Sequence, residues 1–189
     1  MSRKAIAVAA AALLGVLLAA SWGASPAGAQ TSGGKAKKST LTDATKATVT
    51  QEVLQTVKAM FAAAAKVVPW PDISKFCWDT PEFAFLMPDG KVYNYADFGK
   101  FWGEFASQFS AQRFAIRTEK VIVLGPDQAL YFWQGGVDEV QKDGIVLTQD
   151  PYCGTYLFRK VNREWRMAYG HESGLPPTAA KPKTAAPKK

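Results

Sequence analysis

The sequence predicts an α+β domain in which a curved, mostly antiparallel sheet packs against helices that precede it. Apolar side chains recur at helical spacing over residues 49–64 and again over residues 98–109. Four long strand-like segments follow over residues 114–171, and short turns separate them. Because long antiparallel strands twist, a sheet built from them must curl. With 189 residues, 48% of them hydrophobic, the chain can build one well-buried domain.

The first 29 residues have the pattern of an export signal. Arg3 and Lys4 precede an apolar run over residues 5–20, and Ala27-Gly28-Ala29 matches a small-residue cleavage site. We expect cleavage after Ala29 and a periplasmic or secreted protein that keeps no membrane segment. The alternative is an uncleaved anchor, but the run is shorter than the roughly 20 residues that span a bilayer.

Low-complexity segments flank the predicted domain, which we place at residues 48–174. Residues 30–47 are rich in Gly, Ser, Lys and Thr and read as a flexible linker, and residues 175–189 read as a disordered Pro/Lys/Ala tail. The formal net charge is +7, but seven lysines at positions 35–38 and 181–189 lie in these flanks. The domain itself therefore has no basic excess that would indicate a nucleic-acid surface.

The first predicted helix carries one apolar stripe from Val49 to Ala64 and ends before Pro69. Its start is either Thr48, which forms a capping-box pattern with Gln51, or a residue nearer Thr42. Residues 70–78 form a compact, proline-broken turn or short helix.

A short hairpin and a second helix come next. Residues 83–87 and 91–94 are predicted strands around Pro88-Asp89-Gly90, whose glycine suits a turn. Asn94 is a plausible cap for a helix over residues 95–108. The aromatic stripe on this helix is more typical of a core than of a cofactor site. It consists of Phe98, Phe101, Trp102, Phe105 and Phe109.

The four long strands are expected over residues 114–124, 128–140, 145–160 and 164–171, joined by hairpins. Apolar residues fall on both parities, since Tyr131 and Trp133 alternate with Leu130 and Phe132. Both faces of the sheet are therefore expected to be covered, one by the helices and the other by a second subunit of a homodimer.

This order of elements resembles the SnoaL-like (nuclear transport factor 2-like) superfamily, closest to its DUF4440-type members. The resemblance covers residues 51–173 and rests on three stretches, namely residues 87–93, 123–129 and 165–173. It implies a cone-shaped α+β barrel around a central cavity, commonly in a dimer, but it implies no single function. The sequence departs from the family at Tyr169 and Glu172, where members often carry a second His and a Ser.

Two cysteines, Cys77 and Cys153, would fold in an oxidising compartment if the chain is exported. A disulfide between them would close a loop of about 76 residues and contribute roughly 4–5 kcal/mol in the entropic model. The alternative is that both are small buried residues that do not meet.

Candidate catalytic residues are few. His171, the only histidine, is either a general acid/base at the cavity mouth or a structural residue at the end of the last strand. Asp79 and Asp150 are the other weak candidates, because a carboxyl in an apolar pocket can take up or release a proton near neutral pH; turn or surface roles are the alternative. Glu82 and Asp138 have similar surroundings in the sequence. No ligand spacing for a metal and no cofactor motif is present.

Aromatic residues are the candidates for lining a cavity, although core and dimer-interface positions are equally typical of them. We expect the cavity to bind a small apolar or aromatic molecule, with or without turnover. The alternatives are an isomerase, lyase (dehydratase) or hydrolase, in which a buried carboxylate or His171 would work with Tyr donors, and a module for dimerisation alone. The pocket candidates are Trp78, Phe85, Tyr131, Trp133, Tyr156 and His171.

Overall fold

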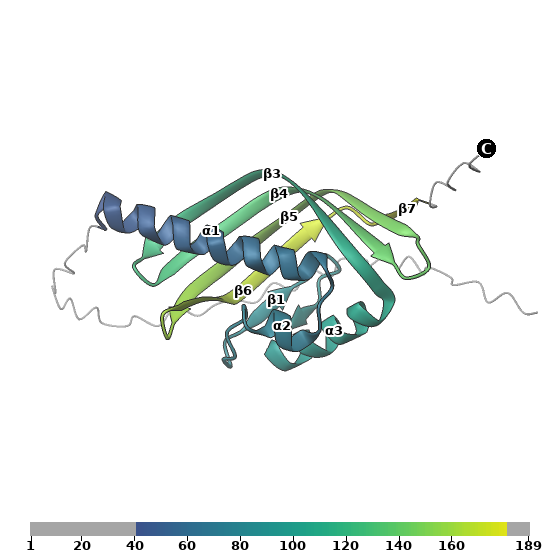
Figure 1. Ribbon diagram of the computed structural model, residues 1–189, viewed down its shortest axis with the longest axis horizontal. Helices are drawn as coiled ribbons and strands as arrows, with labels where there is room; N and C mark the ends of the chain where they lie inside the picture. The colour runs from purple at the N-terminus through teal and green to yellow at the C-terminus, as the bar shows by residue number, and fades with distance from the viewer. Residues whose placement is uncertain (1–40, 181–189) are drawn as a thin grey trace, which may run out of the picture. The chain divides into compact units, whose positions relative to one another are not determined.

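A computed structural model describes residues 41–180, which form three helices and seven strands. Figure 1 shows how these elements are arranged. The predicted signal sequence, most of the linker and the end of the tail lie outside the described residues. No helix of the described range is long and apolar enough to cross a membrane. The elements are α1 Asp43–Ala65, α2 Trp70–Ser74, β1 Ala84–Leu86, β2 Val92–Tyr93, α3 Tyr95–Gln108, β3 Phe109–Gly125, β4 Gln128–Gln141, β5 Val146–Val161, β6 Glu164–Gly174 and β7 Thr178–Ala180.

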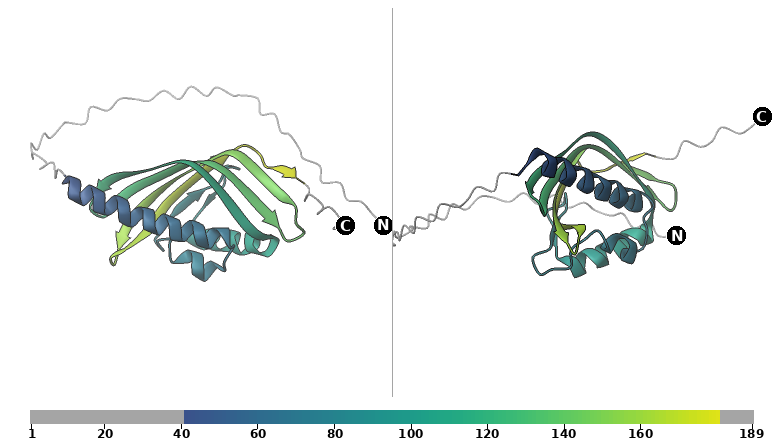
Figure 2. Two further views of the ribbon diagram at one scale, coloured as in Figure 1. Left: turned by 45° about the horizontal axis from the view of Figure 1, so that its top comes forward. Right: turned by 60° about the vertical axis from the view of Figure 1, so that its left-hand side comes forward.

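One curved sheet organises the domain, with the strand order β2-β1-β6-β5-β4-β3. Figure 2 shows the long strands bending around α1, which lies along their concave face, while α2 and α3 lie together near one end of the sheet. The long strands are joined by hairpins and pair antiparallel. The predicted α+β class with a curved sheet around N-terminal helices is therefore confirmed.

The pairing of β1 with β6 is parallel, which the sequence did not indicate. Phe85 is in register with Gly170. Upstream of β1, the N–H of Met167 donates to the carbonyl of Phe76 at 2.7 Å, and the N–H of Trp78 donates to the carbonyl of Met167 at 2.8 Å. This segment between α2 and β1 therefore continues the sheet edge beside β6 and places the short hairpin next to the last long strand.

A β-bulge in β6 decides which of its side chains face the helices. Phe158 pairs with Met167 and Leu157 pairs with Tyr169, so that Ala168 has no partner on β5. Because side chains alternate between faces along a strand, one extra residue exchanges the two faces beyond it. Trp165 and Met167 are buried before the bulge; after it, the inward positions are Gly170, Glu172 and Gly174.

The described helix α1 begins at Asp43, because the hydroxyl of Thr42 accepts the N–H of Thr45 at 3.1 Å and caps it. Residues 43–47 are thus helical and belong to the domain, not to the linker. At the other end, β7 pairs with β5, so residues 178–180 are part of the sheet and not of the disordered tail.

The buried face of α1 presents Val49, Val53, Val57, Met60 and Ala64 to the sheet. Near the start of the helix, one carboxylate oxygen of Glu52 accepts the indole N–H of Trp165 at 2.8 Å and the ammonium group of Lys160 at 2.7 Å. These bonds fix α1 to β5 and β6.

Cys77 and Cys153 are free thiols, so the disulfide that the sequence left open is not formed. Cys77 is buried after α2, where burial raises the pKa of its thiol to about 12. Cys153 is exposed on β5, where its sulfur lies 3.1 Å from the hydroxyl of Ser173. Inward-facing Tyr152 and Gly154 flank Cys153 on its strand, so its side chain points away from the interior that holds Cys77.

Candidate active site

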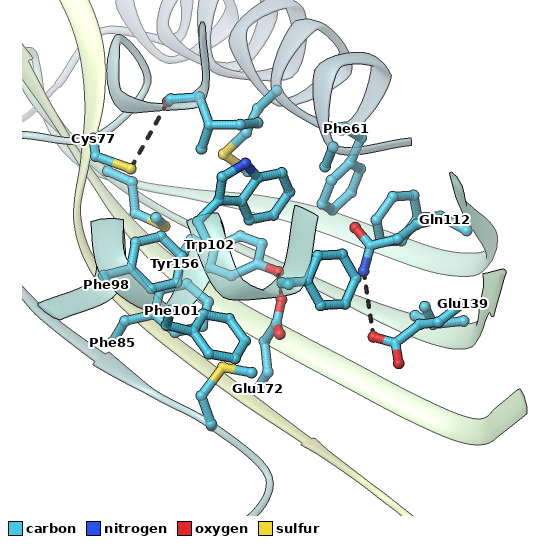
Figure 3. Close-up of a pocket in the computed structure, with 18 of the residues that line it drawn as sticks. Phe61, Cys77, Phe85, Phe98, Phe101, Trp102, Gln112, Glu139, Tyr156 and Glu172 are labelled. Atoms are coloured by element: carbon cyan, nitrogen blue, oxygen red, sulfur yellow. Dashed lines mark hydrogen bonds between the residues drawn. The ribbon is translucent and has the colours of Figure 1, made fainter. Parts of the chain in front are cut away.

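A cavity lies between the concave face of the sheet, the C-terminal half of α1, and α3 (Figure 3). Its volume is about 90 Å³, whereas a cavity needs roughly 10–15 Å³ to hold one water molecule. The space therefore suits several waters or a compact organic molecule.

Aromatic side chains make up nine of the 19 residues that line the cavity. Phe61 of α1 stacks on Phe114 of β3 at 4.8 Å between ring centroids, and Phe85 of β1 stacks on Phe98 of α3 at 4.5 Å. The other lining side chains are Met60, Ala64, Ile73, Cys77, Met87, Phe101, Trp102, Phe105, Gln112, Val137, Glu139, Tyr152, Tyr156, Met167 and Glu172. The predicted core role of the α3 stripe holds, and four of its five residues, all except Phe109, line one side of the cavity.

Glu172 is the central polar group of this site. Its carboxylate accepts the hydroxyl of Tyr152 at 2.6 Å and the hydroxyl of Tyr156 at 2.5 Å, one on each oxygen. The side chain is partly buried, and it lines the cavity. Burial raises the pKa of Glu172 above its ordinary value, although the two tyrosine hydrogen bonds act in the opposite direction.

Glycines on the inward face make room for this arrangement. Gly154 of β5 is in register with Glu172. A Cβ at Gly154 would lie 2.5 Å from the indole nitrogen of Trp133 and 2.8 Å from the Tyr156 hydroxyl. Gly174, opposite Tyr152, leaves space for that ring in the same way, since a Cβ there would lie 2.5 Å from it. The tyrosine rings thus lie across glycine positions and direct their hydroxyls toward Glu172.

A further hydrogen bond supports the bond from Tyr156 to Glu172. The indole N–H of Trp133 donates to the hydroxyl of Tyr156 at 3.3 Å, and that hydroxyl donates in turn to Glu172. Tyr156 is fully buried, and desolvation raises its pKa well above the ordinary value, so it stays a hydroxyl donor. The chain Trp133–Tyr156–Glu172 therefore fixes the orientation of the carboxylate.

A second carboxylate, Glu139 of β4, lines the cavity beside Gln112 of β3, whose amide donates to it at 3.4 Å. Figure 3 shows this pair toward one end of the cavity, away from Cys77. Burial and the negative charge of Glu172 both raise the pKa of Glu139. The site thus contains two carboxyl groups that favour the protonated form more than exposed glutamates do.

The sequence-predicted pocket residues divide into two groups. Phe85 and Tyr156 line the cavity, and Trp133 supports it through Tyr156. Tyr131 is buried outside the cavity, where its hydroxyl donates to Glu119 at 2.9 Å, and Trp78 also lies outside the cavity lining.

None of the predicted catalytic residues reaches the cavity. His171 is exposed and points away from it, because the bulge at Ala168 turns Glu172 inward instead. Asp79 is exposed. Asp150 is exposed and bonded to the guanidinium of Arg117, a hydrogen bond that lowers the pKa of the aspartate. Asp150 is therefore an ion-pair residue of the outer face.

The sequence-based predictions did not include Glu139, Gln112 or the inward-facing role of Glu172. The signal for Glu172 is the alternation Tyr152-x-Gly154-x-Tyr156 on one strand with Gly170-x-Glu172-x-Gly174 on the next. Paired in register, these two patterns place one carboxyl between two tyrosines. Glu139 has no comparable local pattern.

Residues 53–178 match the family model of the SnoaL-like domain. The chain belongs to the SnoaL-like family. None of the curated proteins is similar enough in sequence to count as a relative.

Solved structures share the nuclear transport factor 2-like fold. A superfamily protein from Salmonella enterica serovar Typhimurium is 20% identical, with a TM-score of 0.61 over 76% of this chain and 99% of its own. A structure named a hexachlorocyclohexane dehydrochlorinase is 8% identical, with a TM-score of 0.60 over 77% and 98%. The association domain of CaMKII from C. elegans is 14% identical, with a TM-score of 0.54 over 70% and 99%. At these identities the SnoaL-like chain shares the fold with its neighbours, and function must be argued from the site.

Proposed function

We propose that this SnoaL-like protein binds a small, mostly apolar molecule in the cavity and that Glu172 exchanges a proton with it. The observation that carries the proposal is a partly buried carboxyl in the cavity lining, held by Tyr152 and Tyr156 against an aromatic wall. The reaction class would be an isomerase, lyase or hydrolase. The occurrence of this fold in a protein named a dehydrochlorinase supports such chemistry.

The environment of Glu172 suits general acid–base catalysis. Desolvation brings the pKa of a carboxyl closer to neutral pH, where it can both accept and donate a proton. Tyr152 and Tyr156 are hydroxyl donors that burial keeps protonated. Each donates its one proton to Glu172, so it can turn to negative charge on a ligand oxygen once Glu172 has taken up the ligand's proton. Base and oxyanion donors thus come from two neighbouring strands.

Binding without turnover is the second candidate. It is favoured by the fact that both oxygens of Glu172 already accept a tyrosine hydroxyl, so that the carboxylate is satisfied without a ligand. In this case Glu172 and the tyrosines would serve only to orient the ligand.

Deuterium exchange separates the two candidates. A panel of small cyclic and aryl ketones is incubated with the protein in D₂O, and NMR follows the loss of the protons next to the carbonyl. We expect the wild type to accelerate exchange for at least one ketone. Glu172→Gln should slow this exchange at least about a hundredfold, the lower end of what general acid–base catalysis contributes. His171→Ala should leave the rate unchanged.

The exchange experiment can fail in two ways. Equal rates for Glu172→Gln and the wild type would contradict the proposed role of Glu172. Ketones that bind, as shown by chemical-shift changes of the protein, without any exchange would favour binding without turnover.

Location and assembly are part of the proposal. We propose an exported protein, on the basis of the signal pattern in the first 29 residues, and we keep the assignment to DUF4440-type members as a prediction. We also propose a homodimer through the convex face of the sheet. There, an apolar row crosses four strands in register, made of Ile122, Leu130, Leu157 and Tyr169.

Native mass spectrometry tests the dimer directly. Replacing Leu157 by Glu would place a charge in the middle of the apolar row and should convert a dimer into a monomer. A wild-type monomer at micromolar concentration would contradict the proposed interface.

A further inference from the structure

The cavity lining contains acidic side chains but no basic ones. Of its 19 lining residues, nine are aromatic and two, Glu139 and Glu172, are acidic. No Lys, Arg or His is among them. Any charge that a ligand brings into this space therefore meets carboxyl groups and ring faces only.

The basic residues of the described range lie outside the cavity lining, and two of those on the long strands are paired elsewhere. Lys160 binds Glu52 on α1, and Arg117 binds Asp150 on the outer face. His171 directly precedes Glu172 on β6, but it is exposed and points outward. Within residues 41–180, neither cavity carboxyl has a cationic partner.

Glu139 is the less satisfied of the two carboxyls. Its one hydrogen bond in the described chain is the long contact from the Gln112 amide, whereas Glu172 accepts two short bonds from tyrosines. A buried carboxylate with a single weak donor gains most from a strong donor. Glu139 is thus the group that a ligand can pair with at the least cost to the existing network.

We propose that the ligand of this cavity is an amphiphilic amine, whose ammonium group pairs with Glu139 beside Glu172 and whose apolar body lies among the aromatic rings. This inference rests on the proposed binding function and names its ligand class. An ammonium ion donates to carboxylates and is attracted to the faces of aromatic rings, and both interactions strengthen when water is excluded. An anionic ligand would meet repulsion from the same two carboxyls.

Proton release should accompany the binding of an amine. Tyr152 and Tyr156 from β5 bond to Glu172, and Cys77 lines the far end of the cavity; all three stay protonated at neutral pH. His171, next to Glu172 on β6, is outside the cavity, and its positive charge would lower the pKa of Glu172. Glu139 and Glu172 are then the groups that must ionise to meet the ammonium. Affinity for an amine should therefore rise with pH while the carboxyls of the free protein are still protonated, then stay level, and fall in the region of about pH 10 where an alkylamine loses its own proton.

Three matched probes test this directly, namely 2-phenylethylamine, 2-phenylethanol and 3-phenylpropionate. Isothermal titration calorimetry near pH 5, in two buffers of different ionisation enthalpy, gives the affinity and the number of protons released. We expect the amine to bind at least about tenfold more tightly than the alcohol, with net proton release, and the propionate to bind most weakly.

Glu139→Gln should remove about tenfold of the amine affinity and leave the alcohol affinity unchanged. Its control is Glu164→Gln, which removes an equal charge from an exposed hairpin and should change neither the amine affinity nor the alcohol affinity. A thermal melt of each variant verifies folding. Equal affinity for amine and alcohol, tighter binding of the propionate, or no binding of the amine would each overturn the inference. Ketone exchange that depends on Glu172 would still support the proposed function in all three cases.

Discussion

Glu172 on β6 lies directly opposite Gly154 on β5, and the missing side chain of this glycine is what lets a tyrosine hydroxyl reach the carboxylate. The space above Gly154 is occupied by the hydroxyl of Tyr156 and the indole nitrogen of Trp133. The polar centre of the cavity thus depends on a position that carries no side chain.

Gly154→Ala should therefore disturb both stability and site. A methyl group would overlap two buried side chains, and overpacking of this kind costs about 1–3 kcal/mol. Chemical denaturation measures the loss. The control is Gly103→Ala on the exposed side of α3, where a Cβ meets nothing within 4 Å; it should stabilise the protein by about 0.5–1 kcal/mol. Similar stabilities for both variants would contradict the packing argument.

The stability of the wild type relative to Glu172→Gln should decrease as pH rises. The pKa of Glu172 is raised in the folded protein, so its favourable contribution is complete below the ordinary value of 4.5 and is lost as pH increases through the raised value. At neutral pH the glutamine variant should then be the more stable protein. Urea denaturation of both proteins between pH 4 and pH 8 checks this, and a constant difference would count against a buried carboxyl.

Glu52→Gln should loosen α1. The carboxylate accepts bonds from Lys160 and Trp165, and the Lys160 bond is the main reason that the pKa of Glu52 is lowered. Because the pair is partly exposed, we expect a loss of only about 1 kcal/mol at pH 7. The loss should shrink as pH falls below 4.5 and through the lowered pKa, since the wild-type carboxylate is then protonated. Glu164→Gln is the surface control and should stay within about 0.5 kcal/mol.

Thiol counting tests the state of the cysteines. Protein unfolded in guanidinium without a reductant should expose two reactive thiols, because Cys77 and Cys153 are unpaired. In the native protein Cys77 should remain unreactive, since it is buried and its thiol pKa is raised to about 12. If the unfolded protein instead exposed no reactive thiol, the two cysteines would have to be joined in a disulfide.

The sequence predicts the helices and long strands well, because each has a local signal. Val49 to Ala64 has helical spacing, and the hairpins lie at turn residues such as Gly90 and Gly144, both of which have positive φ. The parallel pairing of β1 with β6 and the pairing of β7 with β5 have no such signal. They join segments far apart in the chain, and only the packed sheet determines them.

The site was harder to predict because one extra residue in β6, Ala168, changes which side chains of that strand face the cavity. Without the bulge at Ala168, the buried parity of Trp165 and Met167 would continue to His171 and would turn the histidine inward. The bulge exchanges the faces and brings Glu172 inward. Nothing local to Ala168 distinguishes it from an ordinary strand residue.

The titration of Glu172 tests the account most directly. Carbon-detected NMR of the side-chain carboxyls in the wild type, with Glu172→Gln to assign the signal, gives its pKa. The account predicts that this resonance titrates above the ordinary value of 4.5 and moves further upward in Tyr152→Phe, which removes one hydrogen bond to the carboxylate. A resonance that titrates at the ordinary value and is indifferent to Tyr152 would place Glu172 in water and contradict the inward-facing site.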